Sequence, residues 1–86
     1  MFINKTQDGR NNICGRRVAY FRTELRISQR ELADRLQLVG LDMDKNAIQR
    51  IEAGKRFVTD IEIIGIARVL DKTIDELLFD DPDQSR

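Results

Sequence analysis

Residues 28–56, SQRELADRLQLVGLDMDKNAIQRIEAGKR, decide the fold of this chain of 86 residues. They contain two short amphipathic segments, over residues 28–38 and 44–53, with a turn containing Gly40 between them. Apolar side chains recur at helical spacing in both segments, and long polar side chains crowd the start of the second. The stretch therefore predicts a pair of helices, the second of which turns a polar face to solvent.

Repeated capping boxes mark where helices begin, since Ser or Thr followed three residues later by Glu satisfies the free backbone N–H groups of a helix start. The chain has three such pairs: Ser28 and Glu31, Thr59 and Glu62, and Thr73 and Glu76. We predict five helices, over about residues 12–25, 28–38, 44–53, 60–70 and 74–79. Gly40 and Gly54 are expected to end the second and third helices, and either Asp42 or Asp44 to cap the third.

The apolar stripes of these helices predict an all-α fold with one small core. The expected inward residues are Ile13 or Cys14, Val18, Phe21 and Leu25; Leu32, Ala33, Leu36 and, at the helix end, Val39; Ala47, Ile48 and Ile51; Ile61, Ile64, Ala67 and Leu70, widened by Ile63 and Ile66; and Ile74, Leu77 and Leu78. A minimal core does not require Phe57, Val58, Leu78 and Phe79, which are candidates for a two-fold interface. We predict one domain over residues 12–79, a flexible N-terminal arm over residues 1–11 and an acidic frayed tail over residues 80–86.

Composition limits the functions open to the chain. Apolar residues make up 41% and charged residues 35%, as is typical of a soluble helical domain. The lone Cys14 has no partner for an internal disulfide, and no apolar run approaches the roughly 20 residues of a membrane-spanning helix, so a cytoplasmic location without a membrane partner is expected. Because the chain has no His, no Cys cluster and no Gly-rich phosphate loop, we expect no enzyme activity, metal, cofactor or small-molecule ligand.

Charge is distributed unevenly along a chain whose formal net charge is zero. Residues 1–60 carry twelve Lys and Arg against eight Asp and Glu, and residues 61–86 carry three against seven. Affinity for a phosphate backbone depends on Lys and Arg, so this asymmetry favours a basic working face and an acidic far side.

A helix pair that reads DNA places its first helix on the backbone and the N-terminal residues of its second helix in the major groove. Ala33 supplies a small residue where the two helices cross, and Ile48 and Ile51 hold the second helix on the body. Side chains whose donors and acceptors suit base edges stand on its outer face: Lys45, Asn46, Gln49 and Arg50. The pattern predicts double-stranded DNA as the partner.

The strings LRISQRELADRL, AIQRIEAGKR, IARVL and IDELL resemble the phage repressor and Cro-like helix-turn-helix family, also called the XRE family, from about Cys14 to Phe79. The resemblance implies a compact five-helix, lambda-repressor-like domain that binds a pseudo-palindromic operator as a homodimer and regulates transcription as a repressor. It assigns base reading to Lys45, Asn46, Gln49 and Arg50, phosphate contacts to Gln29, Lys55 and Arg56, and a buried ion pair to Arg22 and Glu52. Arg17, near the start of the first helix, is either a further phosphate contact or part of a solvated face.

One segment departs from the family pattern. Between Ala33 and Ile48 the chain has roughly five residues more than the commonest family spacing, and QLVGLDMD must lengthen the second helix or its turn. A rival function is a protein-interaction module, antitoxin-like or anti-regulator, in which the same helices bind a protein. The two functions differ in salt dependence, because contacts to phosphate weaken steeply as salt rises.

Overall fold

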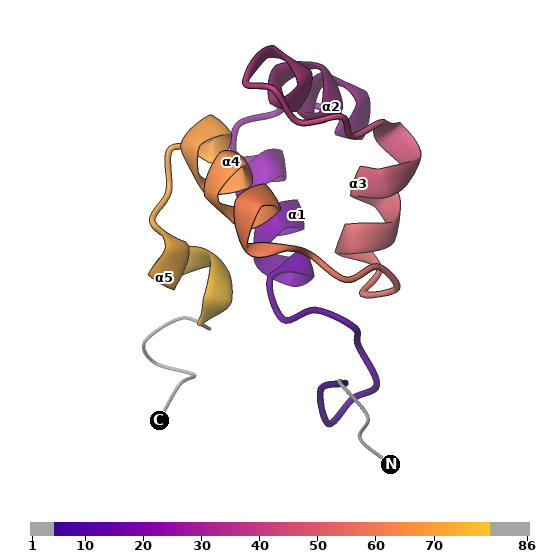
Figure 1. Ribbon diagram of the computed structural model, residues 1–86. Helices are drawn as coiled ribbons and strands as arrows, with labels where there is room; N and C mark the ends of the chain where they lie inside the picture. Colours follow the sequence, from indigo (N-terminus) through magenta and orange to yellow (C-terminus); the bar gives the residue numbers. More distant parts are fainter. Residues whose placement is uncertain (1–4, 80–86) are drawn as a thin grey trace.

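The computed structural model describes residues 5–79, and these form five helices and no strand (Figure 1). The helices are α1 (Gly15–Glu24), α2 (Gln29–Leu38), α3 (Lys45–Glu52), α4 (Asp60–Leu70) and α5 (Ile74–Leu78). The predicted all-α, five-helix fold is confirmed. The predicted tail and the first four residues of the predicted arm lie outside the described residues. Within residues 5–79, no helix is long and apolar enough to cross a membrane.

The short helix α3 lies on one side of the fold. It packs against α1 and α2, whereas α5 packs against α1 and α4. In Figure 1, α2 and α3 form the upper right of the molecule, α1 runs behind α4, and α5 lies at the lower left. One side of α3 is thus held by the body of the domain and the other side is left open.

The predicted helix boundaries follow from capping residues. All three capping boxes form, with Ser28, Thr59 and Thr73 as the caps of α2, α4 and α5. Asp44, one of two alternatives for α3, accepts a hydrogen bond from the Ala47 N–H at 2.8 Å. Gly40 and Gly54 have positive φ angles of 93° and 78°, as expected for residues that end helices.

The lengthened turn between α2 and α3 is anchored to the body at two points. Met43 is buried, and its carbonyl accepts a hydrogen bond from Gln37 Nε2 at 3.0 Å. Leu41 lies against Gly65 of α4, where an added Cβ would come within 2.3 Å of Leu41 Cδ1. The extra residues are therefore part of the packed domain, and they fix where α3 begins.

The predicted inward face of α4 is wrong at Ile61 and Ile64 and confirmed at Ala67 and Leu70. Ile61 and Ile64 are exposed at 69% and 47%, whereas Ile66, Ala67 and Leu70 are buried. The helix has apolar residues on nearly every side, so its sequence alone does not select a face. Packing of Leu41 against Gly65 selects the buried face of α4, because the inserted turn covers the side of the helix that carries Gly65.

The burial predictions at the ends of α1 and α2 are partly wrong. Leu25 and Val39 are exposed because each occupies the C-cap position, where the helix ends and its stripe no longer faces the core. Of the two alternatives at the start of α1, Cys14 is buried and Ile13 is exposed. Burial raises the pKa of the Cys14 thiol to about 11, so the thiol stays protonated at neutral pH and packs as a small apolar group.

Candidate nucleic-acid interface

The outer face of α3 carries the four residues predicted to read bases. Lys45, Asn46, Gln49 and Arg50 are all exposed, while Ile48 and Ile51 on the opposite face are fully buried. The two buried isoleucines fix the rotation of the helix about its axis. The polar face is therefore presented to solvent by the packing of the apolar one.

A hollow of about 380 Å³ lies along this face. Its lining residues are Asn46, Gln49, Arg50, Ala53 and Lys55. Three of the predicted base readers and one predicted phosphate contact thus come together around a single concave surface. A second hollow, of about 300 Å³, lies on the other side of Asn46 and Arg50 and is lined in addition by Asp44, Ala47 and Arg56.

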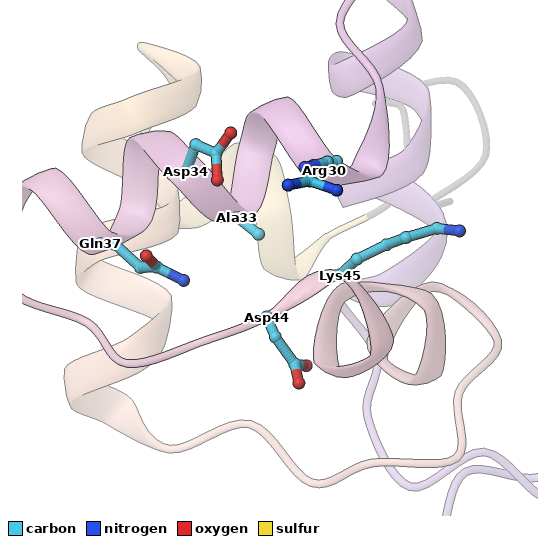
Figure 2. A pocket seen from close by; sticks show the side chains of 6 residues that line it. All are labelled: Arg30, Ala33, Asp34, Gln37, Asp44 and Lys45. Atoms are coloured by element: carbon cyan, nitrogen blue, oxygen red, sulfur yellow. The ribbon is translucent and has the colours of Figure 1, made fainter.

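Lys45 faces a different environment, at the crossing of α2 and α3. Figure 2 shows α2 passing over the first turn of α3, where a hollow of about 340 Å³ is lined by Arg30, Ala33, Asp34, Gln37, Asp44 and Lys45. Two carboxylates stand here beside two cations. Arg30 and Asp34 are exposed residues of α2 that were not among the predicted site residues. Arg30 and Gln37 lie three and four residues from Ala33, the predicted crossing point, and this helical spacing is the sequence signal that they border it.

The expected pair of Arg22 and Glu52 is present between α1 and α3. Arg22 Nε donates to Glu52 Oε2 at 2.6 Å and Arg22 Nη2 donates to Glu52 Oε1 at 3.2 Å, with side chains only 14% and 9% exposed. Gln29, predicted as a phosphate contact, joins them, since its Nε2 donates to Glu52 Oε1 at 3.0 Å. The start of α2 is thereby tied to the end of α3.

Arg56, the second predicted phosphate contact of the loop, is engaged in an ion pair that the sequence reasoning did not anticipate. Its Nη1 and Nη2 each lie 2.9 Å from one carboxylate oxygen of Glu62. Hydrogen bonding to Glu62 raises the pKa of Arg56, and the same bonds hold the pKa of Glu62 below its usual value. Lys55 is exposed and is the loop cation that lines the α3 hollow.

Arg17 is not brought together with the other predicted residues. Its Nε donates to the carbonyl of Glu76 in α5 at 3.2 Å, and its guanidinium lies over the rings of Tyr20 and Phe21. The bond to Glu76 joins α1 to α5, on the side of the fold away from α3 (Figure 1).

The N-terminal segment is closer to the interface than the prediction of a flexible arm indicated. The Thr6 N–H donates to the Arg10 carbonyl and the Gly9 N–H to the Thr6 carbonyl, which forms a compact turn. The Asn11 N–H then donates to the Gly54 carbonyl at 2.7 Å. Residues 5–11 are therefore attached to the loop that follows α3. This attachment spans more than 40 residues of sequence, and no local sequence pattern predicts it.

The pair of Arg56 and Glu62 stabilises the domain at neutral pH, and this stabilisation is lost in acid. The pKa of Glu62 is lower in the folded protein than its unfolded value of about 4.3, so the stabilisation is complete above that pH and is lost as the pH falls through the folded pKa. Replacing Glu62 by Gln is expected to cost about 0.5 to 1 kcal/mol at pH 7 and less at pH 3. Urea unfolding at the two pH values measures the difference, and an equal cost at both would contradict it.

The fold and this face define a class of protein: a helix-turn-helix domain, in which α2 and α3 form the motif and α3 presents its polar face to solvent. The chain belongs to the helix-turn-helix family of DNA-binding transcription regulators, since the profile of that family matches residues 18–77. This confirms the resemblance to XRE-type regulators.

A solved structure supports the assignment. The chain is similar to the restriction-modification controller protein C.AhdI from Aeromonas hydrophila, with 30% identity and a TM-score of 0.65 over 74% of this chain and 86% of that one. No curated protein sequence matches the chain.

Proposed function

We propose that this protein binds a specific operator by inserting α3 into the major groove, with Asn46, Gln49 and Arg50 reading base edges and Lys45 beside them. The observation that carries the proposal is the single hollow in which Asn46, Gln49 and Arg50 meet Lys55. It combines side chains suited to base edges with a cation suited to phosphate.

The dimensions of α3 suit this role. An α-helix with its side chains is about 10 to 12 Å across, which is close to the width of about 12 Å of the major groove. Arg50 offers paired donors for guanine, and Asn46 and Gln49 offer the donor and acceptor pair that matches adenine. Both amide side chains and the guanidinium project from one exposed face, so they can engage neighbouring base pairs together.

We assign phosphate binding mainly to Lys55. Arg56 and Gln29 are further phosphate contacts in this proposal, with smaller contributions, because Glu62 and Glu52 already accept their hydrogen bonds. Arg17 is left out of the interface, because its guanidinium is directed toward α5.

Base reading and phosphate binding are separable by mutation. Replacing Arg50 by Ala is expected to lower the preference for the operator over unrelated DNA by about tenfold to a hundredfold, because a lost bidentate base contact is worth about 1 to 3 kcal/mol. Replacing Lys55 by Ala is expected to weaken binding to all sequences alike and to reduce the salt slope by about one. Fluorescence anisotropy on an operator selected from random DNA, and on a scrambled duplex, measures both.

Arg35→Ala is the matched control, since it removes one exposed arginine of α2 that lines none of the three hollows around α3 described above. Equal losses of specificity for Arg50 and Lys55 would contradict the assignment of roles. If the unmodified protein binds no duplex at low salt, the proposed function itself is wrong and a protein partner becomes the explanation for the exposed face of α3.

We further propose that the protein binds as a homodimer through α4. Its exposed side carries Asp60, Ile61, Ile64 and Arg68. These lie within one stripe of the helix, because Ile64 follows Asp60 and Ile61 by four and three residues and Arg68 follows Ile64 by four. Phe57, in the loop before α4, is also exposed, whereas Val58 and Leu78 pack on the core and are withdrawn from the predicted interface. Phe79 stays exposed at the end of α5.

Charge on the α4 stripe is self-complementary. If two copies of α4 pack antiparallel with Ile64 at the two-fold axis, Asp60 of one protomer faces Arg68 of the other, because both residues are four positions from Ile64. The isoleucines then fill the centre and two ion pairs close the ends. A dimer of this kind presents two copies of α3 to a pseudo-palindromic operator, and we propose that its occupancy represses transcription by excluding polymerase.

A further inference from the structure

The C-terminal end of α3 is closed by the N-terminal segment of the chain. The last carbonyls of a helix have no partner within it and must be satisfied from elsewhere. The Arg50 carbonyl accepts from the N–H of Lys55 in the following loop at 2.8 Å. The Glu52 carbonyl accepts from Arg10 Nη2 at 2.8 Å, and the Ile51 carbonyl accepts from Asn12 Nδ2 at 3.0 Å.

Asn12 connects three parts of the domain through one buried carboxamide. Its Nδ2 donates to the carbonyls of Ile51 and Arg56, at 3.0 and 2.7 Å, and its Oδ1 accepts from the Gly15 N–H at 2.8 Å. The side chain therefore bonds to the start of α1, the end of α3 and the far end of the loop over residues 54–56. Asn12 is the single buried polar side chain among the described residues.

A purely local role for Asn12 does not explain these bonds. Capping the start of α1 requires only the oxygen, whereas both bonds from the nitrogen go to carbonyls on either side of Lys55. Asn11 adds to the same attachment, because its N–H donates to the Gly54 carbonyl and its Nδ2 to the Lys55 carbonyl at 3.0 Å. The backbone on both sides of Lys55 is thus held from the N-terminal segment.

We propose that Asn12 is a positioning residue for DNA binding: its carboxamide holds the loop over residues 54–56 so that Lys55 meets the phosphate backbone. The proposal rests on the proposed function, in which Lys55 binds phosphate. The Asn12 side chain is buried and acts only on the backbone of the loop. It therefore makes no contact with DNA itself.

The test is Asn12→Asp, which keeps the oxygen that accepts from Gly15 and removes the nitrogen that donates to the loop. Gln7→Glu is the matched control, because it makes the same change from amide to acid at an exposed position of the same segment. Trypsin cleaves after Lys55 and Arg56, so cleavage there, well below the unfolding temperature, reports opening of the loop without any DNA. We expect cleavage at these bonds to be about tenfold faster in Asn12→Asp and unchanged in Gln7→Glu.

DNA binding by the same variants tests the second half of the proposal. Asn12→Asp is expected to weaken binding to operator and scrambled duplexes by about tenfold alike, with a salt slope smaller by about one. In this background Lys55→Ala is expected to cost little more, because both changes remove the same contact. Asn11→Ala is a milder variant for the case in which Asn12→Asp does not fold, with about threefold faster cleavage expected.

Two results would overturn the proposal: unchanged cleavage after Lys55 and Arg56, or losses in DNA affinity that add fully when Asn12→Asp and Lys55→Ala are combined. If the unmodified protein binds no duplex at all, the proposed function fails. Faster cleavage in Asn12→Asp would then still show that Asn12 holds the loop over residues 54–56 and does not only cap α1.

Discussion

Replacing Glu52 by Ala is expected to lower the free energy of unfolding by about 3 to 5 kcal/mol, because it breaks an ion pair that is largely shielded from water. Glu52 accepts hydrogen bonds from Arg22 and from Gln29, and little of the Arg22 guanidinium is in contact with water. Removing the carboxylate leaves a cation largely desolvated and without its partner. Small domains are stable by only about 5 to 15 kcal/mol, so a large part of the margin is lost.

Chemical unfolding of three variants separates the pair from the rest of the core. Glu24→Ala, an exposed change in α1, is the control and is expected to cost less than about 0.5 kcal/mol. The double change Arg22→Met with Glu52→Met is expected to cost less than Glu52→Ala alone, because no buried charge is left without a partner. A loss below about 1 kcal/mol for Glu52→Ala would show that water solvates Arg22 in the folded state.

The same pair bears on function through Gln29. Because Gln29 at the start of α2 and Glu52 at the end of α3 are hydrogen bonded, the two helices of the motif are joined at a point away from their crossing at Ala33. Two separate connections fix the angle between α2 and α3. The base readers that we propose on α3 and the phosphate contacts that we propose outside it are therefore held at a set distance from one another.

Helix boundaries were predictable from the sequence because capping is local. Ser28 and Glu31 satisfy each other's backbone groups within a single turn, and the same holds for Thr59 with Glu62 and Thr73 with Glu76. The outer face of α3 was predictable for a related reason, since Ile48 and Ile51 leave one side for the polar residues. The pair of Arg22 and Glu52 came from the resemblance to the family and has no local signature.

The orientation of α4 and the closing of the N-terminal segment were not predictable in this way. α4 is apolar on most sides, and its buried side is selected by Leu41 in a turn more than 20 residues earlier. Asn12 bonds to Ile51 and Arg56 across about 40 residues, and a single asparagine gives no sign of such partners. The pair of Arg56 and Glu62 did carry a signal, because a capping box at Thr59 places the Glu62 carboxylate at the helix start that Arg56 precedes.

Reversing one charge on the exposed side of α4 is expected to have the largest effect on operator binding. In the proposed dimer, Asp60→Arg brings two arginines together at each end of the interface and Arg68→Asp brings two aspartates together. Either change is expected to shift the protein to monomer and to weaken operator binding by about a hundredfold or more, because joining two half-site contacts contributes roughly 10² to 10⁴ in affinity. Binding to a single half-site is expected to change little.

Combining Asp60→Arg with Arg68→Asp is the decisive experiment, since it restores opposite charges across the two-fold axis with their positions exchanged. Sedimentation equilibrium and operator titration are expected to show recovery of both dimer and affinity, whereas Asp75→Arg, an exposed reversal on α5, is expected to leave dimerisation unchanged. Recovery in the double variant requires that Asp60 and Arg68 face each other between protomers, because within one helix they are eight residues apart and do not meet. If the double variant is as monomeric as either single one, the two copies do not pair through an antiparallel α4, and exposed Ile61 and Ile64 then serve another contact.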